Sequence, residues 1–265
     1  MLRYFFKRLM FLIPVLFGVS ILIFSIVHLA PGDPAEVMLG PAATQEDIAN
    51  LREQLGLTKP LYVQYGIFLG NALKGDLGRS IKSNAPVMEE IMERFPATLT
   101  LALLGMTFAI VIGLPLGIIA ALKQNTWVDA LCSFLALVGF SIPNFWIALM
   151  LMLLLSIYIP ILPSSGFDSW KNLIMPTIVL GIQTMAVIAR MTRSSMLEVI
   201  RQDYVRTAKA KGISDRLVLT RHILSNVMIP VVTIAGLYFG HQLGGVVITE
   251  TVFSIPGLGR LIVDA

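Results

Sequence analysis

His241, Gln242 and Glu250 are the polar residues whose positions suggest a chemical role, because they lie inside or just beyond a long apolar segment. Polar side chains in a membrane span mark transport pathways, gates or hydrogen bonds between helices. His241 has no second metal ligand close to it in sequence, so a hydrogen bond between helices is favoured over metal binding. Glu250 and Arg260 bracket a Pro-Gly turn, where they would either gate an outer mouth or sit in solvent. His241, Gln242 and Glu250 are the candidate pathway or gate residues, and we predict no metal site.

The sequence contains none of the common motifs of nucleotide-binding or hydrolytic enzymes. It has no Gly-x4-Gly-Lys-Ser/Thr loop to hold ATP phosphates, and no His-Glu-x-x-His or Gly-x-Ser-x-Gly pattern. Its one cysteine, Cys132, cannot form a disulfide within the chain and is expected to be a small buried hydrophobic residue. We predict a protein that is not an enzyme, has no catalytic residue and binds no cofactor itself.

These residues must be positioned by membrane helices, because the composition is that of a polytopic all-α membrane protein. The chain is 56% hydrophobic and 14% charged, whereas soluble domains carry about 25% charged residues. A helix needs about 20 apolar residues to cross the hydrocarbon core. Five segments meet this condition, at residues 9–29, 98–122, 130–159, 173–189 and 227–249. The third contains Pro143, so we predict a tilt or a kink there.

Basic residues in the loops orient these spans. Arg3, Lys7 and Arg8 precede the first span, and a larger basic cluster at residues 190–221 separates the fourth from the fifth. Counted alternately, both clusters lie on one side, which predicts a cytoplasmic N-terminus. Since this topology explains the cations, the net charge of +4 does not indicate binding to nucleic acid. The first span is longer than a signal-peptide core of about 7–15 residues, so we predict an uncleaved anchor.

The spans divide the chain into three predicted regions, which are the N-terminus with the first span (1–29), an extracytoplasmic helical segment (30–97) and the transmembrane core (98–265). In the middle region, Thr44 and Asp47 form a capping-box pattern, and Gly56 is placed to end the helix that follows. This region is either a lid that only packs or a docking surface for a protein that delivers solute. Five spans leave the chain end outside, and residues 261–265 become apolar again. We therefore expect six spans in the intact chain and a truncation here.

Glycines recur at four-residue spacing in two spans. They are Gly113 and Gly117 in the second span, and Gly236, Gly240 and Gly244 in the fifth. Such spacing places small residues on one helical face and lets another helix approach closely. We predict helix packing at these positions, within the chain or against a sister chain, in preference to a substrate-binding role.

The segment between the fourth and fifth spans predicts a compact helical knob. Asp203 can cap a short helix over residues 204–211, and Gly212 can end it because glycine accepts positive φ. Ser214 can cap a second helix that continues into the fifth span. The predicted surface of the knob carries charges and the small residues Ala208 and Ala210. The knob has the form of a surface that fits a groove on a partner, although the positive-inside bias alone would also explain its cations.

The sequence of this knob resembles the EAA loop of ABC importer permeases. In that loop, Glu-Ala-Ala is followed after three residues by Gly, and after nine more by Ile-x-Leu-Pro. Ala208, Gly212 and Leu224 match this pattern, whereas Arg206, Thr207, His222 and Ser225 depart from it. Further segments resemble the peptide/nickel branch of the family, at residues 1–4, 28–34, 54–62, 75–78, 143–146, 203–208, 229–233 and 256–260. The resemblance covers the whole chain, and that branch has a sixth span after the last of these segments.

The resemblance implies a permease subunit of an ATP-driven importer in a bacterial or archaeal inner membrane. Such a subunit forms the pore with a second permease, here expected to be a related but non-identical chain. Two ATPase subunits, which use ATP and Mg, bind from the cytoplasm, and an extracytoplasmic substrate-binding protein delivers the solute. The knob would be the coupling helix that fits an ATPase groove. The residues implied in this coupling are Asp203, Tyr204, Arg206, Thr207, Ala208, Lys209, Ala210, Lys211 and Gly212.

The solute class stays open among dipeptides, oligopeptides, glutathione and nickel complexes. The alternative function is an ATP-independent secondary transporter or channel. That class favours charged residues inside the spans, and the predicted spans contain almost none. A membrane scaffold that only anchors partners is a third possibility.

Overall fold

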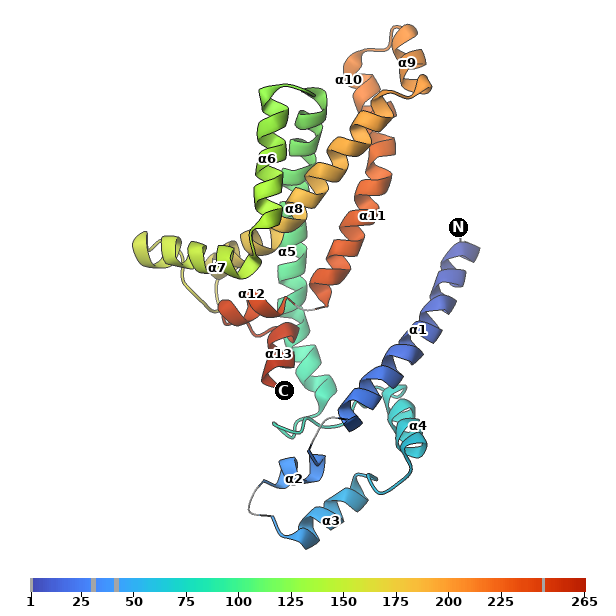
Figure 1. The fold of residues 1–265 in the computed structure, drawn as a ribbon, viewed down its shortest axis with the longest axis vertical. Coiled ribbons are helices and arrows are strands. Elements are labelled where there is room, and N and C mark those ends of the chain that lie inside the picture. The colour runs from blue at the N-terminus through green and yellow to red at the C-terminus, as the bar shows by residue number, and fades with distance from the viewer. Residues whose placement is uncertain (1, 30–31, 41–42, 245) are drawn as a thin grey trace. The chain divides into compact units, whose positions relative to one another are not determined.

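The computed structural model describes residues 2–29, 32–40, 43–244 and 246–265, which form helices joined by loops (Figure 1). No β-strand occurs among these residues, so the predicted all-α class is confirmed. The chain divides into two compact units, one formed by the first 90 residues and the other by Ile91 to Asp264. Met1, Ala30 and Pro31 belong to segments that carry the family resemblance and lie outside the described residues.

The described helices of the first unit are α1 (Leu2–Leu29), α2 (Pro34–Leu39), α3 (Gln45–Gln54) and α4 (Leu61–Ala72). The capping box predicted for α3 is confirmed, because the Asp47 N–H donates to the Thr44 hydroxyl at 3.2 Å and the Thr44 N–H donates to the Asp47 carboxylate at 3.1 Å. Hydrogen bonds from the hydroxyl and then the N–H of Thr44 hold the pKa of Asp47 below its usual value. Gly56 follows the end of α3 with a φ of 70°, a conformation that glycine adopts readily.

The sequence patterns do not predict α4, which packs on α1. The hydroxyls of Ser20 and Tyr65 share a hydrogen bond of 2.8 Å, and the rings of Phe24 and Tyr65 meet edge to face at 5.3 Å. The outer surface of α1 is apolar and exposed, with Leu22 at 63%. An exposed apolar helix of this length is suited to contact with lipid.

The second unit contains most of α5 (Val87–Leu122), followed by α6 (Trp127–Ser141), α7 (Asn144–Met152), η1 (Leu153–Tyr158), α8 (Trp170–Ile200), α9 (Asp203–Ala210), α10 (Asp215–Leu217), η2 (Val218–Ile223), α11 (Leu224–Leu243), α12 (Val247–Val252) and α13 (Leu258–Asp264). The two η elements are π-helices. α8 is the central helix, in contact with α6, α7 and α11. The elements α9 and α10 lie at one end of this unit, and α12 and α13 lie at the other (Figure 1).

Four helical stretches among the described residues are long and apolar enough to cross a membrane, namely Phe6–Leu29, Val87–Leu122, Trp170–Ile200 and Asp215–Leu243. They contain the first, second and fourth predicted spans and most of the fifth. The predicted end of the fifth span, at residue 249, is wrong, because α11 ends at Leu243 and a separate α12 begins at Val247. α5 has 36 residues, which makes it about 54 Å long at 1.5 Å per residue. It is therefore longer than the hydrocarbon core of about 30 Å.

The third predicted span is broken where a tilt or kink was expected. α6 and the helix formed by α7 and η1 meet at 95°, and α7 leaves the axis of α6 in Figure 1. Ile142 is extended, with φ −81° and ψ 129°, because the residue before a proline avoids the helical region. Pro143 also lacks the N–H that would continue the hydrogen bonds of α6. With this pair counted as one bent span, the described residues contain five spans.

Close helix packing occurs at Gly113 and Gly117 of α5. A Cβ on Gly117 would lie 2.5 Å from the carbonyl oxygen of Ala189 and 2.6 Å from Cβ of Thr192, both in α8. A Cβ on Gly113 would lie 2.7 Å from the carbonyl oxygen of Met185. Glycine at these positions lets α5 approach the backbone of α8 closely.

The glycines of α11 have different surroundings. No atom lies within 4 Å of a Cβ added to Gly236 or Gly240, and at Gly244 the nearest atoms are backbone oxygens of the preceding turn. Within the described part of the chain, no second helix packs on this glycine face. Its packing against a sister chain stays a prediction.

Candidate functional site

The knob, residues 201–215, follows α8 at the end of the second unit that is opposite to α12 and α13 (Figure 1). One face of its helix α9 is buried, with Val205 1% exposed and Ala208 5% exposed. These two residues are three positions apart, so they lie on one helical face. They join an apolar cluster with Met196 of α8 and Val218 of η2. α9 is therefore held against the ends of the long helices.

The opposite face of α9 is exposed and carries mostly polar groups. Its exposed residues are Asp203, Tyr204, Arg206, Thr207, Lys209 and Ala210, followed by Lys211. A guanidinium nitrogen of Arg206 lies 3.9 Å from the Asp203 carboxylate, and the Lys209 ammonium lies 3.4 Å from the Asp215 carboxylate. Ion pairs this exposed contribute little to stability. The outer face is therefore free to contact a partner.

Two details of the predicted knob are wrong. Asp203 does not cap α9, because the helix begins at Asp203 itself and Gln202 is the N-cap residue, without a side-chain hydrogen bond. Ala208 is not on the surface, because its spacing from Val205 places it on the buried face. Ser214 does occupy the N-cap position of α10, also without a side-chain hydrogen bond.

Gly212 ends α9 in the predicted manner. Its φ is 75°, its N–H donates to the Lys209 carbonyl at 2.9 Å, and the Ile213 N–H donates to the Ala208 carbonyl at 3.3 Å. These two hydrogen bonds form a Schellman motif. A Cβ added to Gly212 would have no atom within 4 Å. A side chain at this position would therefore strain the backbone, by about 1–2 kcal/mol, without a steric clash.

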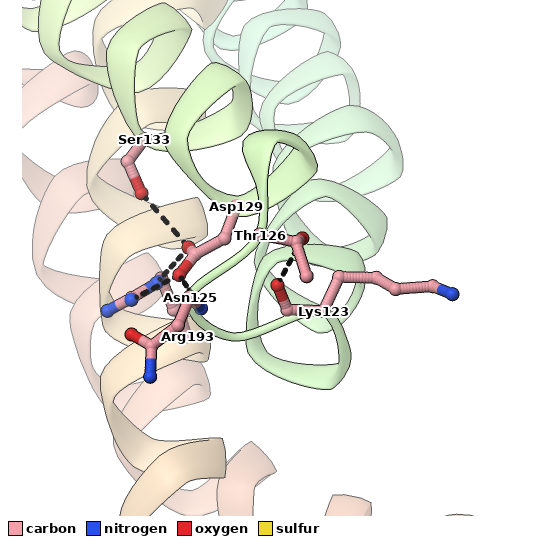
Figure 2. A network of polar contacts seen from close by, with 6 residues as sticks. All are labelled: Lys123, Asn125, Thr126, Asp129, Ser133 and Arg193. Carbon is pink, nitrogen blue, oxygen red and sulfur yellow. Dashed lines mark hydrogen bonds and ion pairs between the residues drawn. The ribbon is translucent and has the colours of Figure 1, made fainter.

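An ion pair next to the knob joins α6 to α8 (Figure 2). Arg193 donates from Nε to Oδ1 of Asp129 at 2.6 Å, and from Nη2 to Oδ2 at 2.7 Å. The side chain of Asp129 is 7% exposed and that of Arg193 is 31% exposed. This is the bidentate geometry of the stronger guanidinium–carboxylate pairs. The pair therefore fixes α6 against α8 about two helical turns before the knob.

The loop between α5 and α6 completes this network. Asn125 has a φ of 62°, which asparagine tolerates, and its N–H donates to Asp129 Oδ2 at 3.1 Å. The Ser133 hydroxyl donates to Oδ1 at 3.4 Å, and the Thr126 hydroxyl donates to the Lys123 carbonyl at 2.6 Å (Figure 2). The sequence patterns do not identify Asp129, because its partner is 64 positions away.

At the other end of the unit, Glu250 is fully buried between α5, α12 and α13. Its Oε1 accepts the Thr98 hydroxyl at 2.7 Å, and its Oε2 accepts the N–H of Arg260 at 3.0 Å. The Thr98 hydroxyl in turn accepts the N–H of Leu258 at 2.8 Å. The alternative that Glu250 sits in solvent is therefore wrong. Glu250 anchors the Pro-Gly turn to α5, and its role as a gate stays a prediction.

The two remaining predicted pathway residues, Gln242 and His241, differ in exposure. Gln242 is 5% exposed, and its Nε2 donates to the Thr184 hydroxyl of α8 at 3.0 Å. Its Oε1 is buried without a hydrogen-bond partner among the described residues. His241 is exposed and makes no side-chain hydrogen bond among those residues. The hydrogen bond between helices that was expected of His241 is thus made by Gln242.

Two family models match the sequence. The model described as "Binding-protein-dependent transport system inner membrane component" matches residues 113–265. The model for the N-terminal part of such membrane components matches residues 1–102. The chain belongs to this family.

Curated relatives align over the whole chain. The dipeptide transport system permease protein DppB of Alkalihalophilus pseudofirmus is 46% identical over 293 residues, which cover 100% of this chain and 88% of the relative. The glutathione transport system permease protein GsiC of Escherichia coli (strain K12) is 47% identical over 265 residues, which cover 100% of this chain and 87% of the relative.

Two solved structures of ABC transporters share the fold at low identity. The MetNI methionine ABC transporter in an inward-facing conformation matches with a TM-score of 0.55 at 19% identity, over 66% of this chain and 79% of that one. An amino acid ABC transporter with histidines matches with a TM-score of 0.54 at 16% identity, over 65% and 76%.

These matches identify the class of protein. The chain is a permease subunit of an ABC transporter of the peptide/nickel branch, a multi-pass protein of the inner membrane that works in a complex with other ABC subunits. It is not an enzyme, and an ATP-independent transporter or channel is not favoured.

Proposed function

We propose that the chain forms part of the pore of an importer for dipeptides or other short peptides such as glutathione, driven by ATPase subunits that bind the knob. The observation that carries this proposal is the two-sided form of α9. Its buried face, with Val205 and Ala208, connects it to the long helices, and its outer face is exposed and bears cations such as Arg206. A rigid helix mounted in this way can transmit a displacement imposed on its outer face to α8 and α11.

The proposed topology places the knob and the N-terminus in the cytoplasm. The loop at residues 123–126 and the knob lie at the same end of the second unit, since the Asn125 N–H donates to Asp129, which in turn accepts two hydrogen bonds from Arg193 of α8. Both segments are basic, and short basic loops face the cytoplasm. In this orientation, α12 and α13 lie on the outer side.

The proposed partners follow from the architecture of such importers. A second, related permease completes the pore, two ATPase subunits that use ATP and Mg bind at the knob, and an extracytoplasmic binding protein delivers the solute. Short peptides are the proposed substrates because relatives that are 46% and 47% identical carry the names of dipeptide and glutathione permeases. Oligopeptides and nickel complexes are the competing solutes to include in transport assays.

The test is to extract the transporter in mild detergent, identify the co-purified subunits and measure ATP hydrolysis. Gly212→Trp adds bulk beside the outer face of α9 at a position with no atom within 4 Å. We expect this variant to insert into the membrane normally but to lose the ATPase subunits and the uptake of labelled dipeptide. Gly212→Asn is the matched control, because asparagine tolerates positive φ and is small. It should retain both activities.

Two outcomes would contradict the coupling role of the knob. One is wild-type uptake and a full complement of ATPase in Gly212→Trp. The other is equal loss in Gly212→Asn and Gly212→Trp, which would attribute the effect to backbone strain. Uptake of labelled oligopeptide or nickel, without uptake of dipeptide or glutathione, would change the proposed substrate and leave the coupling role intact.

A further inference from the structure

A cavity of about 600 Å³ lies behind the knob, between the ends of α5 and α8 and the π-helix η2. Its inner wall is apolar and includes Leu122, Leu197 and Leu219. Ligand-binding cavities in proteins commonly measure about 300–1,000 Å³. π-Helical turns are rare and often occur at functional sites. Its size and local backbone geometry are those of a binding site, and of the residues that line it only Lys209 is among those implied in coupling.

The rim of this cavity has an excess of positive charge. It is formed in part by Arg201, Lys209 and Arg216, with Asp215 as the one carboxylate in the lining. Lys209 and Asp215 form an ion pair at 3.4 Å. Arg201 and Arg216 make no side-chain hydrogen bond or ion pair among the described residues. Two guanidinium groups are thus left without an anion at the mouth of one apolar cavity.

Guanidinium groups bind phosphate through parallel hydrogen bonds and lose less hydration than an ammonium group. Because Arg201 and Arg216 both line the cavity, an anion bound in it would be attracted by both charges. The apolar wall below them requires a ligand with a hydrocarbon part. A ligand that combines a phosphate group with an acyl chain meets both conditions.

The depth of the cavity agrees with this ligand. Leu122 is the last residue of α5 and Ile200 the last residue of α8, and Arg201 follows directly. The polar rim therefore lies at the ends of two membrane-spanning helices, beside the basic segment that the proposed topology places in the cytoplasm. Basic cavities between membrane helices at this level bind anionic lipid head groups.

We propose that this cavity binds an anionic phospholipid, with Arg201 and Arg216 contacting the phosphate and Leu122, Leu197 and Leu219 contacting an acyl chain. The bound lipid connects the end of α8 to η2, the two elements that flank the knob. It thereby restrains the knob without touching its outer face. This site is independent of the transported solute and of the Gly212 test.

The test uses the intact transporter complex in neutral detergent, and the probe is short-chain phosphatidylglycerol. Binding is followed by the shift in thermal unfolding as the probe is titrated. Phosphatidylcholine of the same chain length and inorganic phosphate are the comparison ligands. We expect saturable stabilisation by phosphatidylglycerol, and much weaker effects of both comparison ligands.

Charge-removing variants locate the site. Each basic contact to an anionic lipid contributes about a factor of five in affinity. Arg201→Gln and Arg216→Gln should each weaken binding about fivefold, and the double variant about 30-fold. Arg221→Gln is the matched control, because this exposed arginine of η2 is not among the residues that line the cavity. It should leave the affinity unchanged.

Four results would overturn the proposal. Equal stabilisation by inorganic phosphate would make the ligand a soluble anion, and equal stabilisation by phosphatidylcholine would remove the role of the arginines. If Arg221→Gln weakened phosphatidylglycerol binding as much as Arg201→Gln or Arg216→Gln, the binding would depend on the general charge of the surface and not on this cavity. Loss of ATPase subunits from the double variant with unchanged lipid affinity would assign the two arginines to the ATPase contact.

Discussion

Breaking the ion pair between Asp129 and Arg193 is expected to destabilise the second unit strongly. Arg193 donates two hydrogen bonds, of 2.6 and 2.7 Å, to a carboxylate side chain that is 7% exposed. Hydrogen bonds to charged groups contribute about 1.5–3 kcal/mol each, and breaking a buried pair costs about 3–5 kcal/mol. The side chain of Arg193 is 31% exposed, so water can replace some of the hydrogen bonds that its guanidinium group loses. We therefore expect Asp129→Asn to lower the free energy of unfolding by about 2–3 kcal/mol.

Removing the other partner is expected to cost slightly more. Arg193→Gln leaves a nearly buried carboxylate with hydrogen bonds only from Asn125 and Ser133, which predicts a loss of about 3 kcal/mol. The double variant has no unpaired charge, so its loss should not exceed the loss of about 3 kcal/mol in Arg193→Gln, well below the sum of the single losses. The resulting coupling energy of about 2 kcal/mol is typical of residues in direct contact.

The assay is denaturant unfolding in detergent micelles, followed by a signal from the second unit. Lys123→Gln is the matched control, because Lys123 belongs to the same loop and its exposed side chain points away from the pair in Figure 2. The reasoning fails if the two single losses add to the loss of the double variant within about 0.5 kcal/mol. It also fails if Asp129→Asn is as mild as the control.

Two further tests, each with a control substitution, probe the packing of this unit. Gly117→Ala places a Cβ 2.5 Å from the Ala189 carbonyl oxygen and should cost about 1–3 kcal/mol in unfolding free energy. Gly236→Ala is its control, because the structure has open space at that position, and it should stabilise the chain by up to about 1 kcal/mol through helix propensity. A larger loss of stability in Gly236→Ala than in Gly117→Ala would refute the close approach of α5 and α8. Glu250→Gln keeps the size of the side chain but supplies one acceptor oxygen where two are used, and should cost about 1–3 kcal/mol. The exposed Glu198→Gln is its control in the same unfolding assay, and equal, negligible losses would contradict the role of Glu250 as an anchor.

The features predicted correctly from the sequence are those that depend on nearby residues. The capping box of Thr44 and Asp47 and the turn at Gly212 are each defined within a few positions. The spans at α1, α5 and α8 depend only on local hydropathy. The break at Pro143 was expected as a kink, but its 95° angle also depends on how α7 packs against α8 and α12, which no local pattern specifies.

The buried polar residues show why the rest of the site was not predicted. Glu250 looks exposed in sequence because a Pro-Gly turn and Arg260 follow it. Its burial depends on Thr98, 152 positions earlier, whose hydroxyl joins the carboxylate to the Leu258 N–H. A Cβ on Gly257 would overlap the carboxyl carbon of Glu250, and one on Gly259 would lie 2.7 Å from the Val247 nitrogen. The Pro-Gly-Leu-Gly segment carries the family resemblance. In the structure, its two glycines lack side chains and so leave room for the buried carboxylate of Glu250. An acid, a distant threonine and two glycines therefore form one unit, and only their contacts in three dimensions reveal it.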